Sequence, residues 1–309
     1  MLLHFVNERL SSYPTIRRQS LYSLNDIGIL FRPSLFCSGV NLNPEQREAD
    51  YYDIAIAIEL LQISTLVADD IFDDSPLRNN NESVQEKFGV KNAIIIAELF
   101  KSFSTEIILN NKKLKASQKG NIILNFEEAY QKICIGQFLD LQFEKEEIIS
   151  EEEYFDLIIH TTGYFIQKSL LSGALVAEID TVCYQALAEY GLKLGIAYQL
   201  RDDIVNLVTD GSNGKCIAED LISKKKRLPV IHALNRKENK EFLKIWNKSK
   251  ITSNDALLLV EILKKYGSLD YCKQHLERLR KETAKSIRKI KAGKQKKNLL
   301  GFVDIICSI

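Results

Sequence analysis

The chain has 309 residues, of which 45% are hydrophobic and 27% charged, and its formal net charge is +1. This composition is typical of a globular protein, and the near-zero charge argues against nucleic acid or an anionic membrane as a partner. With only 14 Gly and 5 Pro, the chain has too few turn residues for an all-β protein, so an all-α fold is predicted. No linker-like stretch divides it, which predicts a single domain over residues 1–309.

Apolar residues recur with the period of a helix in five long segments and five shorter ones. The long segments are 46–72, 90–110, 114–144, 151–177 and 181–208, and the shorter ones are 227–235, 239–248, 254–266, 269–290 and 297–307. Turn residues separate them, among them Ser75-Pro76 and Asn79-Asn80-Asn81. A bundle of long helices is therefore expected.

The six cysteines are scattered and include no Cys-x-x-Cys pair, which argues against a thiolate metal site and a disulfide framework. The first residues lack both the charged and the apolar region of a signal peptide. No window holds 18 uncharged apolar residues, so no membrane span is expected. We therefore predict a cytoplasmic protein with reduced thiols.

Two acidic clusters end long apolar runs and are the most informative features of the chain. Asp69 and Asp70 lie four and three residues before Asp73 on a helix, so the three carboxylates are expected to share one face. Carboxylates placed so closely repel each other unless a cation neutralises them. Clusters with only oxygen ligands suit Mg²⁺, which also binds substrate phosphates. Asp202 and Asp203 form a second such cluster, and we expect the two together to bind a diphosphate through metal ions.

These clusters belong to a series of motifs that resembles the trans-isoprenyl diphosphate synthases (polyprenyl synthetases) and the terpene synthases related to them. The resemblance runs from about residue 28 to residue 234. Five motifs occur in the family's order: 66–73 (LVADDIFD), 75–78 (SPLR), 136–141 (GQFLDL), 195–203 (GIAYQLRDD) and 220–229 (DLISKKKRLP). A lone Asp-Asp-x-x-Asp motif is a weak signal, whereas five motifs in order identify the chain as a member.

The resemblance implies the class I isoprenoid synthase fold, a bundle of long antiparallel helices around a deep apolar cavity with both acidic motifs at its mouth. It implies a cluster of three Mg²⁺ ions held by Asp69, Asp73 and Asp202, with Asp70 and Asp203 in supporting roles. Asn206 replaces the last aspartate of the second motif and can bind metal through its amide oxygen. Members of this family are usually homodimers, so a homodimer is expected.

The resemblance also implies a set of residues that bind substrate. Arg78, Lys215 and Lys225 would contact the oxygens of an allylic diphosphate. Polar contacts carried over from the motifs are Gln62, Thr161, Gln199 and Arg32, and the apolar pocket would include Tyr164 and Phe165. Ser64 and Thr65 stand where bulky aromatic residues limit chain length in the family, so small residues there imply room for a C15–C20 chain.

The second diphosphate site, for isopentenyl diphosphate, departs from the family pattern. Ile29 replaces a lysine, Asn79 replaces an arginine, and His160 replaces the lysine of a Lys-Thr pair. Each charge-assisted contact to phosphate is worth about 1.5–3 kcal/mol, so these losses weaken that site.

Three functions fit this pattern. The main interpretation is a terpene synthase, or cyclase, that ionises an allylic diphosphate without adding isopentenyl diphosphate. The alternative is a chain-elongating prenyl diphosphate synthase of the farnesyl or geranylgeranyl type, in which Lys168, His160 or the strongly basic segment 281–297 replaces the missing charges. The third is a non-catalytic subunit of a heteromeric synthase.

Overall fold

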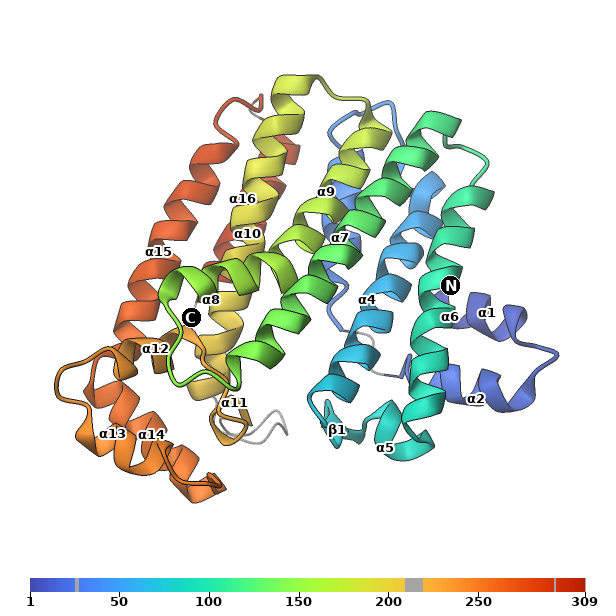
Figure 1. The fold of residues 1–309 in the computed structure, drawn as a ribbon. Coiled ribbons are helices and arrows are strands. Elements are labelled where there is room, and N and C mark those ends of the chain that lie inside the picture. The colour runs from blue at the N-terminus through green and yellow to red at the C-terminus, as the bar shows by residue number, and fades with distance from the viewer. Residues whose placement is uncertain (26–27, 209–218, 292, 309) are drawn as a thin grey trace. The chain divides into compact units, whose positions relative to one another are not determined.

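The computed structural model describes residues 1–25, 28–208, 219–291 and 293–308, and its ribbon is built almost entirely of helices (Figure 1). The chain divides into two compact units. Unit 1 comprises Met1–Glu127 and Ser169–Asp180, and unit 2 comprises Glu128–Lys168 and Thr181–Ile309. Two of the three boundaries fall inside the helices α7 (Ala116–Phe143) and α9 (Tyr164–Ala177), so each of these helices contributes residues to both units, and the third falls between residues 180 and 181.

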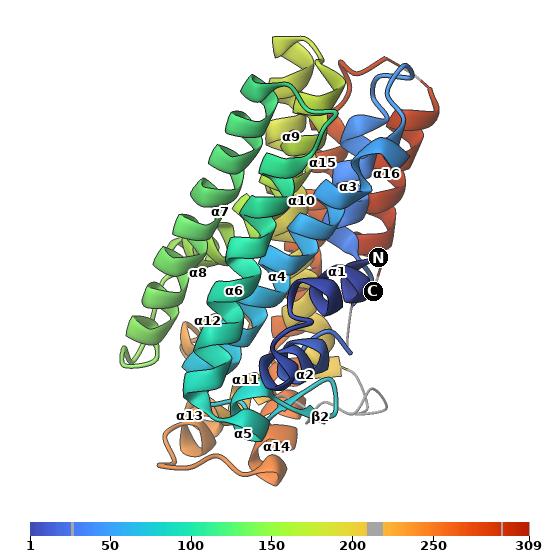
Figure 2. The same cartoon turned by 90° about the vertical axis from the view of Figure 1, so that its right-hand side faces the viewer.

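Unit 1 is organised around α4 and α6, which lie side by side in both views (Figures 1 and 2). The central helix α4 is apolar on several sides, and Ile54, Ile58 and Leu60 on it are fully buried. A helix that is hydrophobic all round belongs in a core. The elements of this unit are α1 (Leu2–Arg9), α2 (Pro14–Tyr22), α3 (Phe31–Val40), η1 (Glu48–Tyr51), α4 (Tyr52–Phe72), β1 (Leu77–Arg78), β2 (Asn81–Glu82), α5 (Val84–Phe88) and α6 (Val90–Asn110), with the adjoining parts of α7 and α9.

Unit 2 is organised around α10, which packs against α15 and α16. Its elements are α8 (Glu151–Ile158), η2 (Ile159–Gly163), α10 (Thr181–Val208), α11 (Glu219–Ile222), α12 (Leu228–Leu234), α13 (Lys240–Trp246), α14 (Ser253–Lys265), α15 (Ser268–Ser286) and α16 (Lys294–Cys307), with the adjoining parts of α7 and α9. A smaller apolar core lies among α11 to α15 and includes Phe242, Trp246 and Leu259.

A π-helical turn interrupts one predicted helix. Residues 151–177 were expected as one helix, and the structure divides them into α8, the π turn η2 and α9. Two glycines explain how closely α10 approaches this turn, since a Cβ atom on Gly195 would lie 2.7 Å from the Cα of Gly163. Single π turns are frequent at functional sites, and this one carries His160, Thr161 and Thr162.

The all-α prediction is confirmed, and every predicted helical segment contains a helix or a helix pair at nearly the predicted position. The sequence did not predict the helices α1, α2, α3, α5 and α11, or the small β1–β2 hairpin. In the part of the chain that the structure describes, no helix combines the length and the apolar character needed to cross a bilayer.

Candidate active site

The first acidic motif occupies the C-terminal end of α4. Asp69 and Asp70 lie in its last turn, and Asp73 caps the helix, with its N–H donating to the carbonyl of Asp69 at 2.9 Å. Asp70 points into the protein and is only 2% exposed, whereas Asp69 and Asp73 are half-buried. The three carboxylates therefore divide into one that is buried and two, called accessible below, that are partly exposed, although Oδ1 of Asp73 is itself buried.

A tight hairpin returns a cation to this cluster. Asn79 and Asn80 both have positive φ angles, 48° and 69°, which is the pattern of the type I′ turn that joins twisted strands. The hairpin brings Arg78 back to α4, where its Nε donates to both oxygens of Asp70 at 2.9 and 2.8 Å. Its Nη2 lies 3.2 Å from Asp69. The acidic motif contains no cation of its own, so the positive charge of Arg78 reduces the repulsion between the carboxylates of Asp69 and Asp70.

The pairing with Arg78 determines what Asp70 can do. Burial raises the pKa of Asp70, and the hydrogen bond and charge of Arg78 oppose that rise. The Gln85 side chain adds a hydrogen bond of 2.6 Å to the Asp70 carbonyl and fixes the helix end. These contacts suit the supporting role expected for Asp70. The contact between Arg78 and a diphosphate stays a prediction.

The second acidic motif, in unit 2, has the same division between an inward and an accessible carboxylate. Asp203 is 2% exposed and accepts a hydrogen bond from the Tyr154 hydroxyl at 2.7 Å. It accepts another from Gln199 Nε2 at 2.8 Å, and the Gln199 oxygen accepts one from Thr162 at 2.7 Å. Asp202 is half-buried. Gln199, expected to touch substrate, is thus also part of the network that orients Asp203.

Helix α8 places Tyr154 because its start is strongly specified. Ser150 Oγ accepts from the Glu153 N–H at 3.1 Å, and the Glu153 carboxylate accepts from the Ser150 N–H at 2.7 Å. This capping box fixes the first turn, and Tyr154 follows it directly. The Tyr154 side chain is fully buried, so its hydroxyl needs a partner, and Asp203 provides one.

The raised pKa of Asp203 predicts how the free energy of unfolding of the metal-free protein depends on pH. Burial raises its pKa to about 7, from 3.8 in an unfolded chain, against the opposing charge of Arg227. Between these values the folded state holds a proton that the unfolded state has released. The stability from this group is therefore complete at low pH and is lost as pH rises through 7, with a slope of up to about 1.4 kcal/mol per pH unit.

We expect Asp203→Asn to remove this slope, because asparagine does not titrate. The measurement is urea denaturation of both proteins in EDTA from pH 5 to pH 8. The stability of the wild type should fall relative to that of the variant across this range. Parallel curves would show that Asp203 is not protonated in the folded state.

A third cluster lies in unit 2 around Asp140, which sits on α7 and is 8% exposed. Its carboxylate lies 3.3 Å from Lys225 Nζ and 3.1 Å from Arg227 Nη1. Arg227 Nε is also 3.9 Å from Asp220. Although burial raises the pKa of Asp140, the charges of Arg227 and Lys225 hold it below its usual range.

The backbone conformation of residues 220–225 explains the turn that precedes this cluster. Lys224 has a φ of 55°, in the left-handed region, and the Lys225 N–H donates to the Asp220 carbonyl at 2.8 Å. This ends α11 and turns the next three side chains inward. Lys226 then donates to the carbonyl of Phe143 at 2.7 Å, at the C-terminal end of α7, where a cation is favourable.

The other predicted residues of unit 1 lie on α3 and α4. Thr65 Oγ1 donates to the Gln62 carbonyl at 2.7 Å, and Ser64 is buried at 1% exposure. Arg32 is half-buried on α3, and its charge opposes the burial that raises the pKa of Glu59 on α4. Arg32 therefore already has a carboxylate nearby within its own unit.

The other predicted residues of unit 2 lie in and beside the π turn, with the exception of Asn206, which is half-buried on α10. Thr161 Oγ1 donates to the Leu157 carbonyl at 3.1 Å. The Tyr164 ring has Lys132 Nζ 5.2 Å from its centroid, and Phe165 is fully buried. Lys215 lies outside the described residues.

Two of the cations suggested as replacements in the second diphosphate site, Lys168 and His160, already have partners. Lys168 forms an ion pair with Glu128, and His160 Nδ1 lies 2.8 Å from the Asp156 carbonyl. Both would have to change partner to bind a phosphate.

Each acidic motif, taken by itself, has the ligand chemistry that a divalent metal prefers. Asp69 and Asp73 in unit 1 and Asp202 in unit 2 offer only hard oxygen ligands, which Mg²⁺ and Ca²⁺ prefer. Asp70 and Asp203 are held by protein donors and so suit supporting roles. Over residues 1–25, 28–208, 219–291 and 293–308, no three His, Cys, Asp or Glu side chains gather closely enough to hold a metal by themselves.

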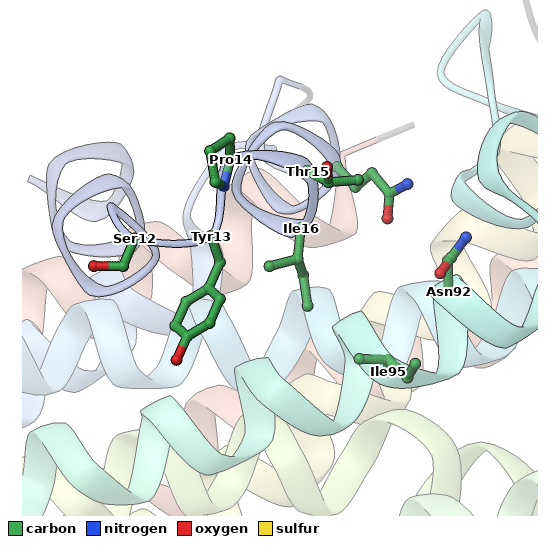
Figure 3. Close-up of a pocket in the computed structure, with 8 residues that line it drawn as sticks. Ser12, Tyr13, Pro14, Thr15, Ile16, Asn92 and Ile95 are labelled. Atoms are coloured by element: carbon green, nitrogen blue, oxygen red, sulfur yellow. The ribbon is translucent and has the colours of Figure 1, made fainter.

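A separate hollow of about 390 Å³ lies in unit 1, away from the predicted site residues. Figure 3 shows Tyr13 and Ile16, from the start of α2, facing the same space as Asn92 and Ile95 of α6. Its lining holds no Lys, Arg, Asp or Glu side chain. It therefore lacks the charges that would bind a diphosphate or a metal.

Sequence reasoning missed Tyr154 and Arg227. Tyr154 precedes the π turn and has no motif around it, so only the fold connects it with Asp203. Arg227 belongs to the motif 220–229, which was recognised, but its burial against Asp140 was not. The available signal was Asp140 itself, a charged residue within an apolar helix that requires a cation.

The helical fold and the paired acidic motifs define the class of isoprenoid synthases with the class I fold. The family model for polyprenyl synthetases matches residues 14–263, and the chain belongs to this family. The predicted family and fold class are thereby confirmed, and the protein is an enzyme of isoprenoid biosynthesis.

Three known proteins illustrate the similarity. A geranylgeranyl diphosphate synthase of Sulfolobus acidocaldarius is 30% identical over 97% of this chain and 95% of that protein. The crystal structure of geranylgeranyl pyrophosphate synthetase from Pyrococcus horikoshii has a TM-score of 0.89 and 26% identity, and the match covers 100% of this chain and 95% of that one. The enzyme of Corynebacterium glutamicum, solved with isoprenyl diphosphate and magnesium, has a TM-score of 0.86 over 99% of this chain and 98% of that one, and its 21% identity shows the fold alone.

Proposed function

We propose that the protein is a Mg²⁺-dependent prenyl diphosphate synthase that condenses isopentenyl diphosphate with an allylic diphosphate. The observation that carries this proposal is the 30% identity to a geranylgeranyl diphosphate synthase along nearly the whole chain. The comparisons thus favour the alternative reached from sequence and do not support the main interpretation, a terpene synthase. The matching first motif and its Arg78 contact also argue against a non-catalytic subunit.

In this proposal the accessible carboxylates Asp69, Asp73 and Asp202 hold the magnesium ions. Bound magnesium would neutralise the diphosphate leaving group and so favour heterolysis of the allylic C–O bond. Arg78 and the Tyr154–Asp203–Gln199 network keep the two inward carboxylates fixed, so that the accessible ones are preorganised. The apolar side chain of Phe165 would exclude water from the allylic cation.

One departure in the isopentenyl diphosphate site has a structural reason. Asn79 has a φ of 48°, a conformation that asparagine adopts more easily than arginine, so the hairpin turn explains this residue. Ile29 has no such explanation and is 76% exposed. A terpene synthase remains the second candidate because Ile29 supplies no charge for a diphosphate.

We also infer a cytoplasmic homodimer. Val90, Ile94 and Ile95 on α6 are each about half exposed, which favours a further helix partner. None of the five cysteines in the described part of the chain forms a disulfide, and reduced thiols are usual in a reducing compartment.

Product analysis with Mg²⁺ and C10, C15 or C20 allylic diphosphates, each with and without labelled isopentenyl diphosphate, tests the function. Labelled, longer prenyl diphosphates are expected. Hydrocarbon or alcohol formed from an allylic diphosphate alone would instead establish a terpene synthase. A lack of product in both arms would favour the non-catalytic subunit.

We expect Ser64→Phe to shorten the product by at least one five-carbon unit. Ser64 is buried on α4, so a phenyl ring there would occupy space that the growing chain needs. The measurement is the product distribution, with Ser64→Ala as the control that adds no bulk. Overpacking can cost about 1–3 kcal/mol, so folding is checked by thermal denaturation. An unchanged chain length in a folded variant would contradict the proposed path of the chain.

A further inference from the structure

Asp140 is a buried carboxylate that holds two cations, and the two are not equivalent. Arg227 faces it with two nitrogens, Nη1 3.1 Å from Oδ1 and Nη2 3.5 Å from Oδ2. Lys225 meets it with one, Nζ 3.3 Å from Oδ2. The side chains of Asp140, Lys225 and Arg227 are 11%, 8% and 16% exposed, so water screens the cluster poorly.

More than one carboxylate holds the Arg227 side chain in place. Its Nε lies 3.9 Å from Asp220 Oδ2, and its charge also acts on Asp203. Its planar fork matches carboxylate geometry and is rigid, whereas the lysine ammonium is a point charge on a flexible stem. If Arg227 left, Asp140 and Asp220 would both lose a cation. If Lys225 left, Asp140 would keep Arg227.

This asymmetry matters because a buried carboxylate without a cation is strongly destabilising. A lysine that was the only partner of Asp140 would be held there, since moving would strand the carboxylate. With Arg227 present, Lys225 can exchange Asp140 for another anion without that penalty.

We infer that Arg227 is a positioning residue that keeps Asp140 neutralised, so that Lys225 can change partner from Asp140 to the diphosphate of the substrate. The inference rests on the proposed function in one respect, namely that the substrate presents a diphosphate. Arg227 itself touches no substrate in this account and acts through Lys225.

The test measures binding of inorganic diphosphate with Mg²⁺ by isothermal titration calorimetry, with no turnover involved. Lys225→Met is expected to weaken binding by about 10- to 100-fold, the loss of one charge-assisted phosphate contact. Arg227→Met should weaken binding by a similar factor, because Lys225 is then held by Asp140. The Lys225→Met/Arg227→Met double variant should bind no more weakly than either single variant, whereas independent contributions would multiply.

The effect of Arg227→Met measured in an Asp140→Asn variant distinguishes a positioning role of Arg227 from a structural role or a long-range effect of its charge on diphosphate. Without a carboxylate at position 140, Lys225 is not held, so Arg227→Met should cost less than about threefold there. The double variant Asp140→Asn/Arg227→Met has no buried carboxylate without a cation at position 140, so it is expected to stay folded even if Arg227→Met alone does not. Arg227→Lys, which restores a cation, should recover part of the lost affinity. Lys226→Met removes the same charge from the same segment, where it caps α7, and should leave diphosphate affinity within about twofold.

Three results would overturn the inference: wild-type affinity in folded Arg227→Met, wild-type affinity in Lys225→Met, or an undiminished Arg227→Met effect in the Asp140→Asn background. Failure of the proposed function can be distinguished from failure of this inference, because product formation tests the function and diphosphate binding tests the inference. A protein that binds diphosphate with this pattern but makes no elongated product would refute the function and retain the inference.

Discussion

Replacing Arg78 with methionine is expected to lower the free energy of unfolding by about 3 kcal/mol. Asp70 is 2% exposed and receives hydrogen bonds from Arg78 Nε on both oxygens, so the substitution leaves a buried carboxylate without its cation. The value is at the lower end for breaking a buried ion pair because the Arg78 side chain is 32% exposed and water can reach the gap. Urea denaturation in EDTA measures it without a contribution from bound metal.

A double-mutant cycle tests the reason for that loss. Adding Asp70→Asn to Arg78→Met removes the stranded charge, so the double variant should be more stable than Arg78→Met alone. Lys87→Met is the matched control, since its ion pair with Glu82 in the same region is exposed and is expected to contribute less than about 1 kcal/mol. If the losses of Arg78→Met and Asp70→Asn simply add, the pair does not stabilise the protein as described.

The hairpin that carries Arg78 shows how far sequence reasoning reaches. Asn79-Asn80 was recognised as a turn, and the positive φ angles of both residues explain why asparagine is found there. The partner of Arg78 was not foreseen, because the motif assigned it to a diphosphate. Sequence spacing places residues along one helix, whereas the path of a hairpin back onto that helix is a tertiary property.

The helices show the same limit. The long segments were predictable because their apolar residues repeat with a helical period over many turns. Helices α1 and α2 have only eight and nine residues, too few for a clear period. Helix α3 has six buried residues on several sides and is hardly amphipathic, so it gave no periodic signal. The π turn was also not predicted, because the helical period of residues 151–177 continues through it, and the close approach of Gly195 to Gly163 beside it is a tertiary contact.

The candidate site divides in a similar way. The identity of the carboxylates was available from the motifs, but which of them face inward was not. Asp70 and Asp203 are buried because Arg78, Tyr154 and Gln199 reach them from other elements or another turn. Tyr154 is 49 residues from Asp203, so no local pattern indicates this partner, whereas Gln199 is only four residues from Asp203 on the same helix.

Because Asp69 and Asp73 are the accessible carboxylates of the first motif, their substitution is expected to have the largest effect on catalysis. Asp69→Asn and Asp73→Asn should each lower kcat/KM by at least about 100-fold, more than the loss of a residue that only orients a metal ligand. Each should also raise the Mg²⁺ concentration that gives half-maximal rate, because an amide oxygen carries less charge than a carboxylate. Steady-state kinetics over a magnesium titration measures both quantities.

Asp74→Asn provides the control for this pair. It removes the same charge from the adjacent position, and Asp74 is exposed with a φ of 48°, a conformation that asparagine tolerates. Its kcat/KM should stay close to that of the wild type. Wild-type kinetics in Asp69→Asn and Asp73→Asn would place the metal elsewhere. Because Asp70 is already committed to Arg78, Asp70→Asn should act mainly on stability, so stability and activity can be assigned to different carboxylates of one motif.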